Sequence, residues 1–123
     1  MIPTDQTKFG YPDGNCLAAC LASIFEIPID NVPDFGNRSD WYENFTIWCI
    51  YKFELYPIDV TIESCEAGGI MPTGYHIING TSKNGDFHHS VVGRNGEVFH
   101  DPHPDGALKE PQSYTLFVRT FLE

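Results

Sequence analysis

One cysteine near the start of the chain, and a group of histidines with an aspartate much later, are the side chains best suited to chemistry. Cys16 follows a turn sequence, and four of the five histidines lie between positions 88 and 103, with Asp101 among them. A thiol nucleophile needs a base that takes its proton, and that base needs an acceptor that holds its tautomer. The order cysteine, then histidine and acid, is that of a thiol-protease-like triad, although chance also produces it in many chains.

Cys16 is expected in the first turn of a helix. Asp13 and Gly14 are turn residues, and either Asp13 or Asn15 can cap the helix that follows. Pro28 ends this helix. Its apolar residues recur at helical spacing: Leu17, Cys20, Leu21, Ile24 and Phe25. The free N–H groups at a helix start favour a thiolate, but a small buried hydrophobic residue fits this position equally well.

Metal binding is the main alternative chemistry for these residues. Cys16 and Cys20 are spaced to lie on one face of a helix and could bind zinc with two histidines, while His100 and His103 could chelate a metal by themselves. The chain has no Cys-x-x-Cys motif, and Cys20 falls within the apolar stripe, so we expect no metal site. A structural histidine cluster in an inert domain is the remaining alternative.

Length and composition predict one globular domain over residues 1–123, of which 41% are hydrophobic. Lys and Arg number 7 against 17 Asp and Glu, and the formal net charge of −10 argues against nucleic acid and anionic membranes as partners. Such a charge favours basic substrates, although it also serves solubility alone. Neither a basic, apolar secretory signal nor a membrane-length apolar run is present, so we expect a cytoplasmic protein with reduced cysteines.

Helical patterns come first in the chain and strand patterns after, which predicts an α+β fold with an antiparallel sheet. The helical segments are a first helix over residues 14–27, a helical turn within 29–35 and a second, buried helix from 39 or 40 to Pro57. Strands are predicted at 58–63, 74–80, 87–93, 97–101 and 114–122.

The hairpin around Arg94-Asn95-Gly96 decides which histidine can meet the acid. A three-residue loop pairs Gly93 with Glu97 and places His89 directly opposite Asp101. Directly opposed Cβ atoms lie about 4.5–5.5 Å apart, which lets a carboxylate hold an imidazole N–H. A two-residue loop would put the two side chains on different faces. We therefore expect the three-residue loop, with the preceding histidine on the other face.

Four segments of the chain form one set of motifs. They are Thr4-Asp5-Gln6-Thr7, Gly14-Asn15-Cys16-Leu17-Ala18-Ala19-Cys20, His89-Ser90-Val91-Val92-Gly93-Arg94-Asn95-Gly96 and His100-Asp101-Pro102-His103-Pro104. Together they resemble a family of small papain-like cysteine peptidase-fold proteins of bacteria and phages. The resemblance covers nearly the whole chain and implies N-terminal helices packed on a C-terminal antiparallel sheet. It further implies Cys16 as nucleophile, His89 as base, Asp101 as the orienting acid and Gln6 as an oxyanion donor.

The expected function is thiol-dependent acyl transfer on a peptide or protein amide, an isopeptide or a thioester. Hydrolysis is the default, so we expect a cysteine peptidase or amidase that needs no cofactor. A transamidase would use the same triad with an amine in place of water. A binding module without catalytic activity on a peptidase scaffold, encoded by a phage, is the alternative from another class, since fold does not fix function.

Overall fold

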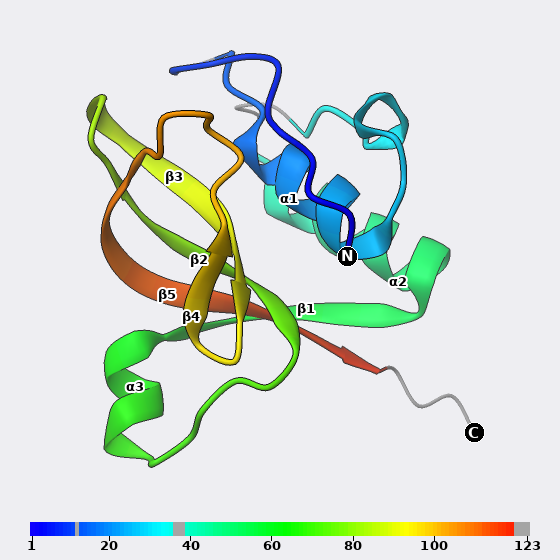
Figure 1. Cartoon of the computed structure of the whole chain (residues 1–123). Coiled ribbons are helices and arrows are strands. Elements are labelled where there is room, and N and C mark those ends of the chain that lie inside the picture. Colours follow the sequence, from blue (N-terminus) through cyan, green and yellow to red (C-terminus); the bar gives the residue numbers. More distant parts are fainter. Residues whose placement is uncertain (12, 36–38, 120–123) are drawn as a thin grey trace.

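The computed structural model describes residues 1–11, 13–35 and 39–119. Within these residues, two helices precede the strands of a single sheet, and a third helix follows the first strand (Figure 1). The elements are α1 (Cys16–Phe25), the 3₁₀ turn η1 (Ile29–Asn31), α2 (Trp41–Phe53), β1 (Leu55–Thr61), α3 (Ile62–Ala67), β2 (Tyr75–Ser82), β3 (Gly85–Arg94), β4 (Glu97–His100) and β5 (Leu108–Arg119). All strand pairs are antiparallel, and the order is β1-β5-β2-β3-β4. The predicted α+β class with an antiparallel sheet is confirmed, while positions 120–122 of the last predicted strand lie outside the described residues.

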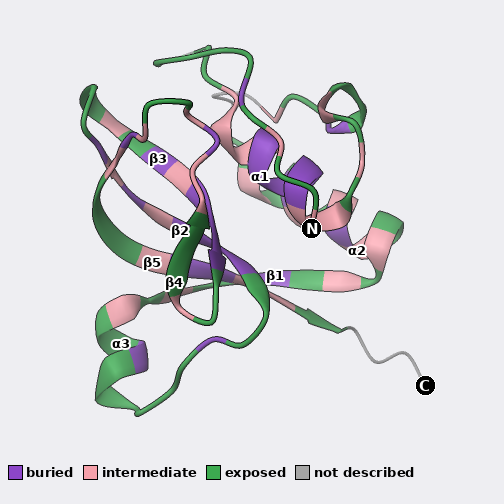
Figure 2. Cartoon of the chain, in the orientation of Figure 1, coloured by how far each residue is buried: buried purple, intermediate pink, exposed green. Residues whose placement is uncertain are grey.

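Both faces of the sheet are covered. Neighbouring residues of a strand point to opposite sides, so one strand supplies residues to both faces. Ile77 and Val92 pack with α1 and α2 around Leu21 and Phe45, in a cluster that joins the helices to the sheet. A second cluster under α3 takes the alternate residues Ile78 of β2 and Val91 of β3, with Cys65 of α3 and Tyr114 of β5. Figure 2 shows the buried residues concentrated in α1 and in the central strands. The helical part is thus fixed against the centre of the sheet.

Helix α1 runs from Cys16 to Phe25, two residues shorter at each end than the predicted 14–27; Cys16 lies in its first turn, as predicted, but the expected capping differs. Asn15 occupies the position before the helix and makes no side-chain capping bond. Its Oδ1 instead accepts from the backbone N–H groups of Thr7 and Lys8, at 3.0 and 2.9 Å. The side chain therefore fastens the preceding loop to the start of α1.

Helix α2 is only half buried, which corrects the prediction of a helix buried on nearly all sides. Phe45 and Cys49 are buried, whereas Tyr51 is 85% and Ile47 is 44% exposed. The apolar residues around the helix are too numerous for one sheet face to cover. No helix among residues 1–11, 13–35 and 39–119 has the length and apolar character needed to cross a bilayer.

Helix α3 replaces the end of the strand predicted at 58–63. The strand stops at Thr61, whose Oγ1 caps the new helix by accepting from the Ser64 N–H at 3.1 Å. A Thr followed three residues later by a polar side chain is a helix-start signal that the alternating pattern of the strand hides. This helix carries Cys65 against the second face of the sheet.

The predicted three-residue hairpin loop is wrong. Arg94 pairs with Glu97, and the two-residue loop between them has positive φ at Asn95 (52°) and Gly96 (86°), as a type I′ turn requires. The Gly96 N–H donates to the buried His76 Nε2 at 3.0 Å, which further fixes this turn. Local turn chemistry therefore determines the loop, as it does for most Asn-Gly sequences.

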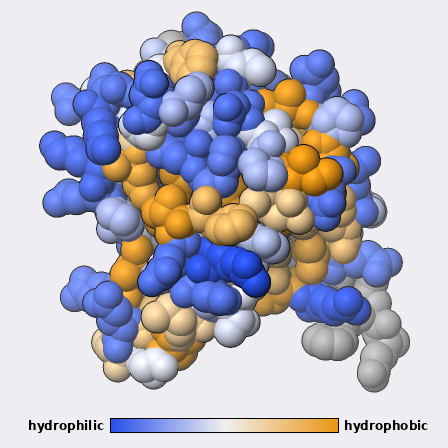
Figure 3. All heavy atoms as spheres, in the orientation of Figure 1, coloured by the Kyte–Doolittle hydropathy of each residue, from blue (hydrophilic) through white to orange (hydrophobic). Residues whose placement is uncertain are grey.

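A β-bulge one residue pair further from the turn allows the contact between His89 and Asp101 that the predicted loop would have allowed. Gly93 pairs with Val98 but Val92 pairs with His100, so Phe99 is an extra residue in β4. The shift by one residue brings Asp101 to the same side as His89. Val98 and Phe99 are about half exposed. Apolar residues cross the middle of the face of the molecule that Figure 3 shows.

Candidate active site

A cleft of about 1070 Å³ lies between the helical part and one end of the sheet. The loop before α1 and the first turns of α1 and α2 line one side, including Gln6 and Cys16. The β2–β3 hairpin, β3 and the β4–β5 loop line the other side, including His89 and His103. The predicted nucleophile and the predicted base therefore face one cleft from opposite walls.

The segment before α1 ties these two walls together. The Thr4 N–H donates to Ser23 Oγ of α1 at 2.9 Å, and the Gln6 N–H donates to the Pro102 carbonyl of the β4–β5 loop at 2.9 Å. His100 Nε2 lies 3.2 Å from the Thr4 carbonyl. These contacts bring the start of the chain beside residues about a hundred positions later, which local sequence patterns do not reveal.

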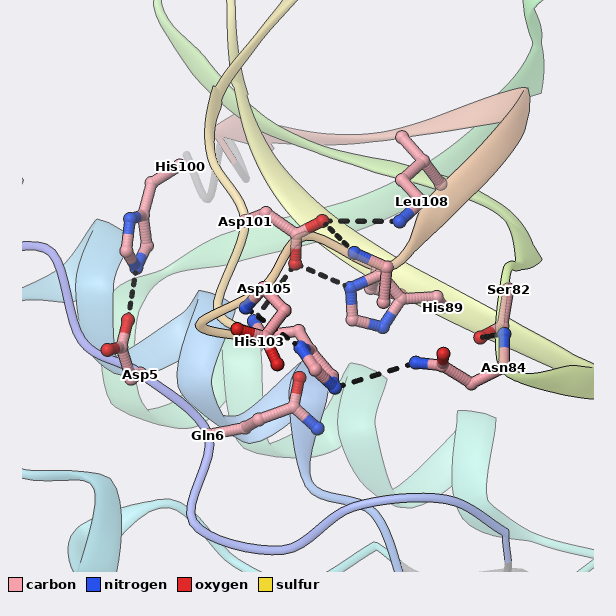
Figure 4. Close-up of polar contacts among 12 residues, drawn as sticks. Asp5, Gln6, Ser82, Asn84, His89, His100, Asp101, His103, Asp105 and Leu108 are labelled. Atoms are coloured by element: carbon pink, nitrogen blue, oxygen red, sulfur yellow. Dashed lines mark hydrogen bonds and ion pairs between the residues drawn. The ribbon is translucent and has the colours of Figure 1, made fainter.

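Asp101 accepts four hydrogen bonds from described residues (Figure 4). His89 Nε2 donates to its Oδ1 at 2.7 Å, and the His103 N–H donates to the same oxygen at 2.9 Å. Its Oδ2 accepts from the N–H groups of Ala107 and Leu108 at 2.8 and 3.2 Å. Burial opposes the charge of this carboxylate, but the bonds from His89 and the backbone outweigh burial and hold the pKa of Asp101 well below its ordinary value.

His89, the predicted base, is buried, with only 4% of its surface exposed. Burial alone would lower the pKa of His89, but the hydrogen bond to Asp101 and the interaction with Cys16 raise this pKa to about 9. The Asp101 bond uses Nε2, so Nδ1 is the ring atom left for the Cys16 thiol. A cationic imidazole beside a thiol favours the thiolate form.

Cys16 differs from the other cysteines in its surroundings. All four cysteines lie in the described part of the chain, and Cys16 alone among them is partly exposed, while Cys20, Cys49 and Cys65 are buried. Burial raises the pKa of Cys20, with smaller contributions from Cys16 and Asp101, and it raises the pKa of Cys49 to about 12. Among these thiols, Cys16 combines access to the cleft with a helix start.

Gln6 lines the cleft, but its side-chain amide already donates one hydrogen bond within the protein. Its side chain is buried, and Nε2 donates to the Lys8 carbonyl at 2.9 Å. A primary amide carries a second N–H, which no hydrogen bond to a described residue uses. Its Oε1 is buried and accepts no hydrogen bond from a described residue. The amide is therefore held in place by one bond and retains the capacity that the predicted role needs.

Replacing Gln6 by Ala is expected to lower turnover by about 10²–10³-fold, the usual loss for one oxyanion donor. The lost bond to Lys8 should cost about 1 kcal/mol of stability, which leaves most molecules folded. Turnover per folded molecule and the melting temperature measure the two effects. The exposed Gln112 offers a control, because Gln112→Ala should change neither quantity. Normal turnover with a large loss of stability would make Gln6 structural.

His103 is a cleft residue to which the sequence analysis gave no catalytic role. Its ring centroid lies 6.4 Å from that of His89. Its Nδ1 accepts from the Asp105 N–H at 3.1 Å, and its Nε2 lies 3.5 Å from Asn84 Nδ2 across to the β2–β3 turn (Figure 4). The sequence signal that could have identified His103 was its position two residues after Asp101, within a Pro-rich loop. His76, by contrast, is buried and takes part in the hairpin turn.

Within residues 1–11, 13–35 and 39–119, no group of three or more His, Cys, Asp or Glu side chains is arranged to hold a metal ion. Cys20, the partner of Cys16 in the alternative zinc site, belongs to the buried core cluster. Comparison of the chain with protein-family models, with curated proteins and with solved structures found no match. The interpretation of the cleft therefore depends on its own geometry.

Proposed function

We propose that this protein is a cysteine-dependent hydrolase of the papain-like type, which cleaves amide or isopeptide bonds through Cys16, His89 and Asp101. One observation carries the proposal. His89, which is hydrogen-bonded to Asp101 at 2.7 Å, lines the same cleft as Cys16, the partly exposed thiol at the start of a helix. A thiol on the helical wall, with base and acid on the sheet wall, supports the papain-like assignment.

The mechanism begins with proton transfer from the Cys16 thiol to Nδ1 of His89, whose cation Asp101 stabilises. The thiolate then attacks the substrate carbonyl carbon, forming a C–S bond and an oxyanion. The backbone N–H of Cys16, which opens the helix, and the Gln6 amide hold this oxyanion. His89 returns its proton to the leaving amine as the C–N bond breaks, and water then hydrolyses the acyl-enzyme.

Alkylation with a limiting dose of iodoacetamide tests this proposal without a known substrate. We expect Cys16 to be modified first, because it combines access with a neighbouring imidazolium, while Cys20, Cys49 and Cys65 are buried. Peptide mass spectrometry of the native protein near pH 6 identifies the labelled position.

The His89→Ala variant is the control for this labelling. It should slow the labelling of Cys16 near pH 6, because the neighbouring imidazolium is lost, while its fold, followed by circular dichroism, persists. Equal labelling of Cys16 and Cys65 in the native protein, or an unchanged rate of Cys16 labelling in a folded His89→Ala variant, would contradict the hydrolase proposal.

A further inference from the structure

The two walls of the cleft differ in chemistry. The helical wall presents the aromatic residues Phe9, Tyr11 and Trp41, which are 50%, 70% and 37% exposed. The sheet wall presents the exposed carboxylates of Asp86 and Asp105. No Lys or Arg is among the described residues that line the cleft. Aromatic surface that stays exposed beside a reactive thiol favours contact with an apolar group of a ligand.

An adjoining hollow of about 450 Å³ continues the negative charge beyond the cleft. Its described lining residues include the carboxylates of Asp13, Asp30 and Asp34 and one cation, Lys8. The two hollows share Gly14, Leu17 and Trp41. None of the carboxylates of the cleft wall or the hollow forms an ion pair with a described residue. Several carboxylates around one opening, none of them paired with a cation of the described residues, attract a cationic ligand and disfavour an anionic one.

Gln6 supplies an independent sign that the cleft is incomplete without a ligand. It lines the cleft at 6% exposure, and no described residue donates a hydrogen bond to its Oε1. A buried acceptor without a donor costs free energy until something donates to it. The backbone N–H groups of a polypeptide are donors of the required kind.

From these observations we infer that the substrate is a polypeptide segment with a Lys or Arg beside an apolar or aromatic residue at the scissile bond; this rests on the proposed hydrolase function. Neighbouring side chains of an extended segment point to opposite sides. One residue can therefore contact Phe9 and Trp41 while the next extends its cation toward Asp86 and Asp105. The negative net charge of the chain adds long-range attraction for such a segment.

Dipeptidyl acyloxymethyl ketones that pair Phe with Lys, Gln or Glu, in both orders, test this inference. The Cys16 thiolate forms a C–S bond with such a probe while the acyloxy group departs as a carboxylate, so mass spectrometry reports the labelling rate. We expect the Lys probes to react about tenfold faster than the Glu probes, with the ratio falling as salt rises. Asp86→Asn and Asp105→Asn should each lower this ratio about twofold to fivefold.

The remote Glu63→Gln change in α3 is the matched control, because it removes the same charge away from the cleft and should leave the ratio unchanged. Trp41→Ala should slow every Phe-containing probe while keeping the Lys-to-Glu ratio. Equal rates for Lys and Glu probes, or equal effects of Asp86→Asn and Glu63→Gln, would overturn the inference. If iodoacetamide still selects Cys16 in that case, only the substrate class is wrong; if it does not, the hydrolase proposal itself fails.

Discussion

Turnover is expected to vanish when Cys16 is replaced by Ala, with kcat falling by roughly 10⁶-fold, because the variant lacks the proposed nucleophile that forms the acyl-enzyme. Cys16→Ser should fall to a similar level, since His89 is poised for a thiol and a hydroxyl gives up its proton far less readily. Cleavage of a peptide library, followed by mass spectrometry of new termini, measures the loss. The fold should persist, because Cys16 lies partly exposed at the edge of α1.

Cys65→Ala is the control for this experiment. Cys65 is buried in the cluster under α3, away from the cleft, so its loss should reduce stability slightly and leave turnover per folded molecule unchanged. Trapping of a covalent acyl intermediate on the native protein, but not on Cys16→Ala, would identify the bond that forms. If the library were cleaved equally by the native protein and Cys16→Ala, Cys16 would not be the nucleophile.

Asp101→Asn is expected to lower both activity and stability. The carboxylate accepts bonds on both oxygens, and an amide has only one oxygen to offer, so at least one pair of donors loses its acceptor. Breaking such a half-buried charged pair should cost about 3 kcal/mol. Loss of the group that orients the base should lower kcat by about 10⁴-fold. Thermal unfolding and library cleavage measure the two effects.

The pH dependence of stability distinguishes the loss of the His89–Asp101 ion pair from other causes of lower stability in Asp101→Asn. The pKa of His89 is raised to about 9, so its stabilising contribution is complete below the ordinary histidine pKa of about 6.5 and disappears as pH rises through 9. The lowered pKa of Asp101 makes its contribution complete above about pH 4 and lost at lower pH. The difference in melting temperature between native protein and Asp101→Asn should therefore be largest between about pH 4 and 6.5.

Asp5→Asn is the matched control, since Asp5 also contacts a histidine, His100 at 3.1 Å, but with its side chain 57% exposed. Exposed pairs contribute little to stability, so this variant should melt close to the native protein across the whole pH range. A difference between native protein and Asp101→Asn that is flat with pH would mean that the ion pair does not cause it.

Local patterns in the sequence were sufficient for the helix that carries Cys16. Its turn, its apolar spacing and Pro28 are all near in sequence, and the helix lies within the expected range with Cys16 in its first turn. The same holds for the α+β class, because the change from helical to alternating patterns is visible along the chain. The short helix α3 was missed because the apolar spacing around Thr61 also fits a strand, and packing of Cys65 under the sheet favours the helix.

The sequence by itself determined which side chains are available for chemistry and the turn that Asn95 and Gly96 form, since both depend on residue type and local backbone preference. Only the tertiary structure decided how His89 meets Asp101. The extra residue Phe99 in β4 corrects the register, and the Pro102 carbonyl receives the Gln6 N–H from the other end of the chain. Such choices depend on the packing free energy of distant segments, which no local pattern contains.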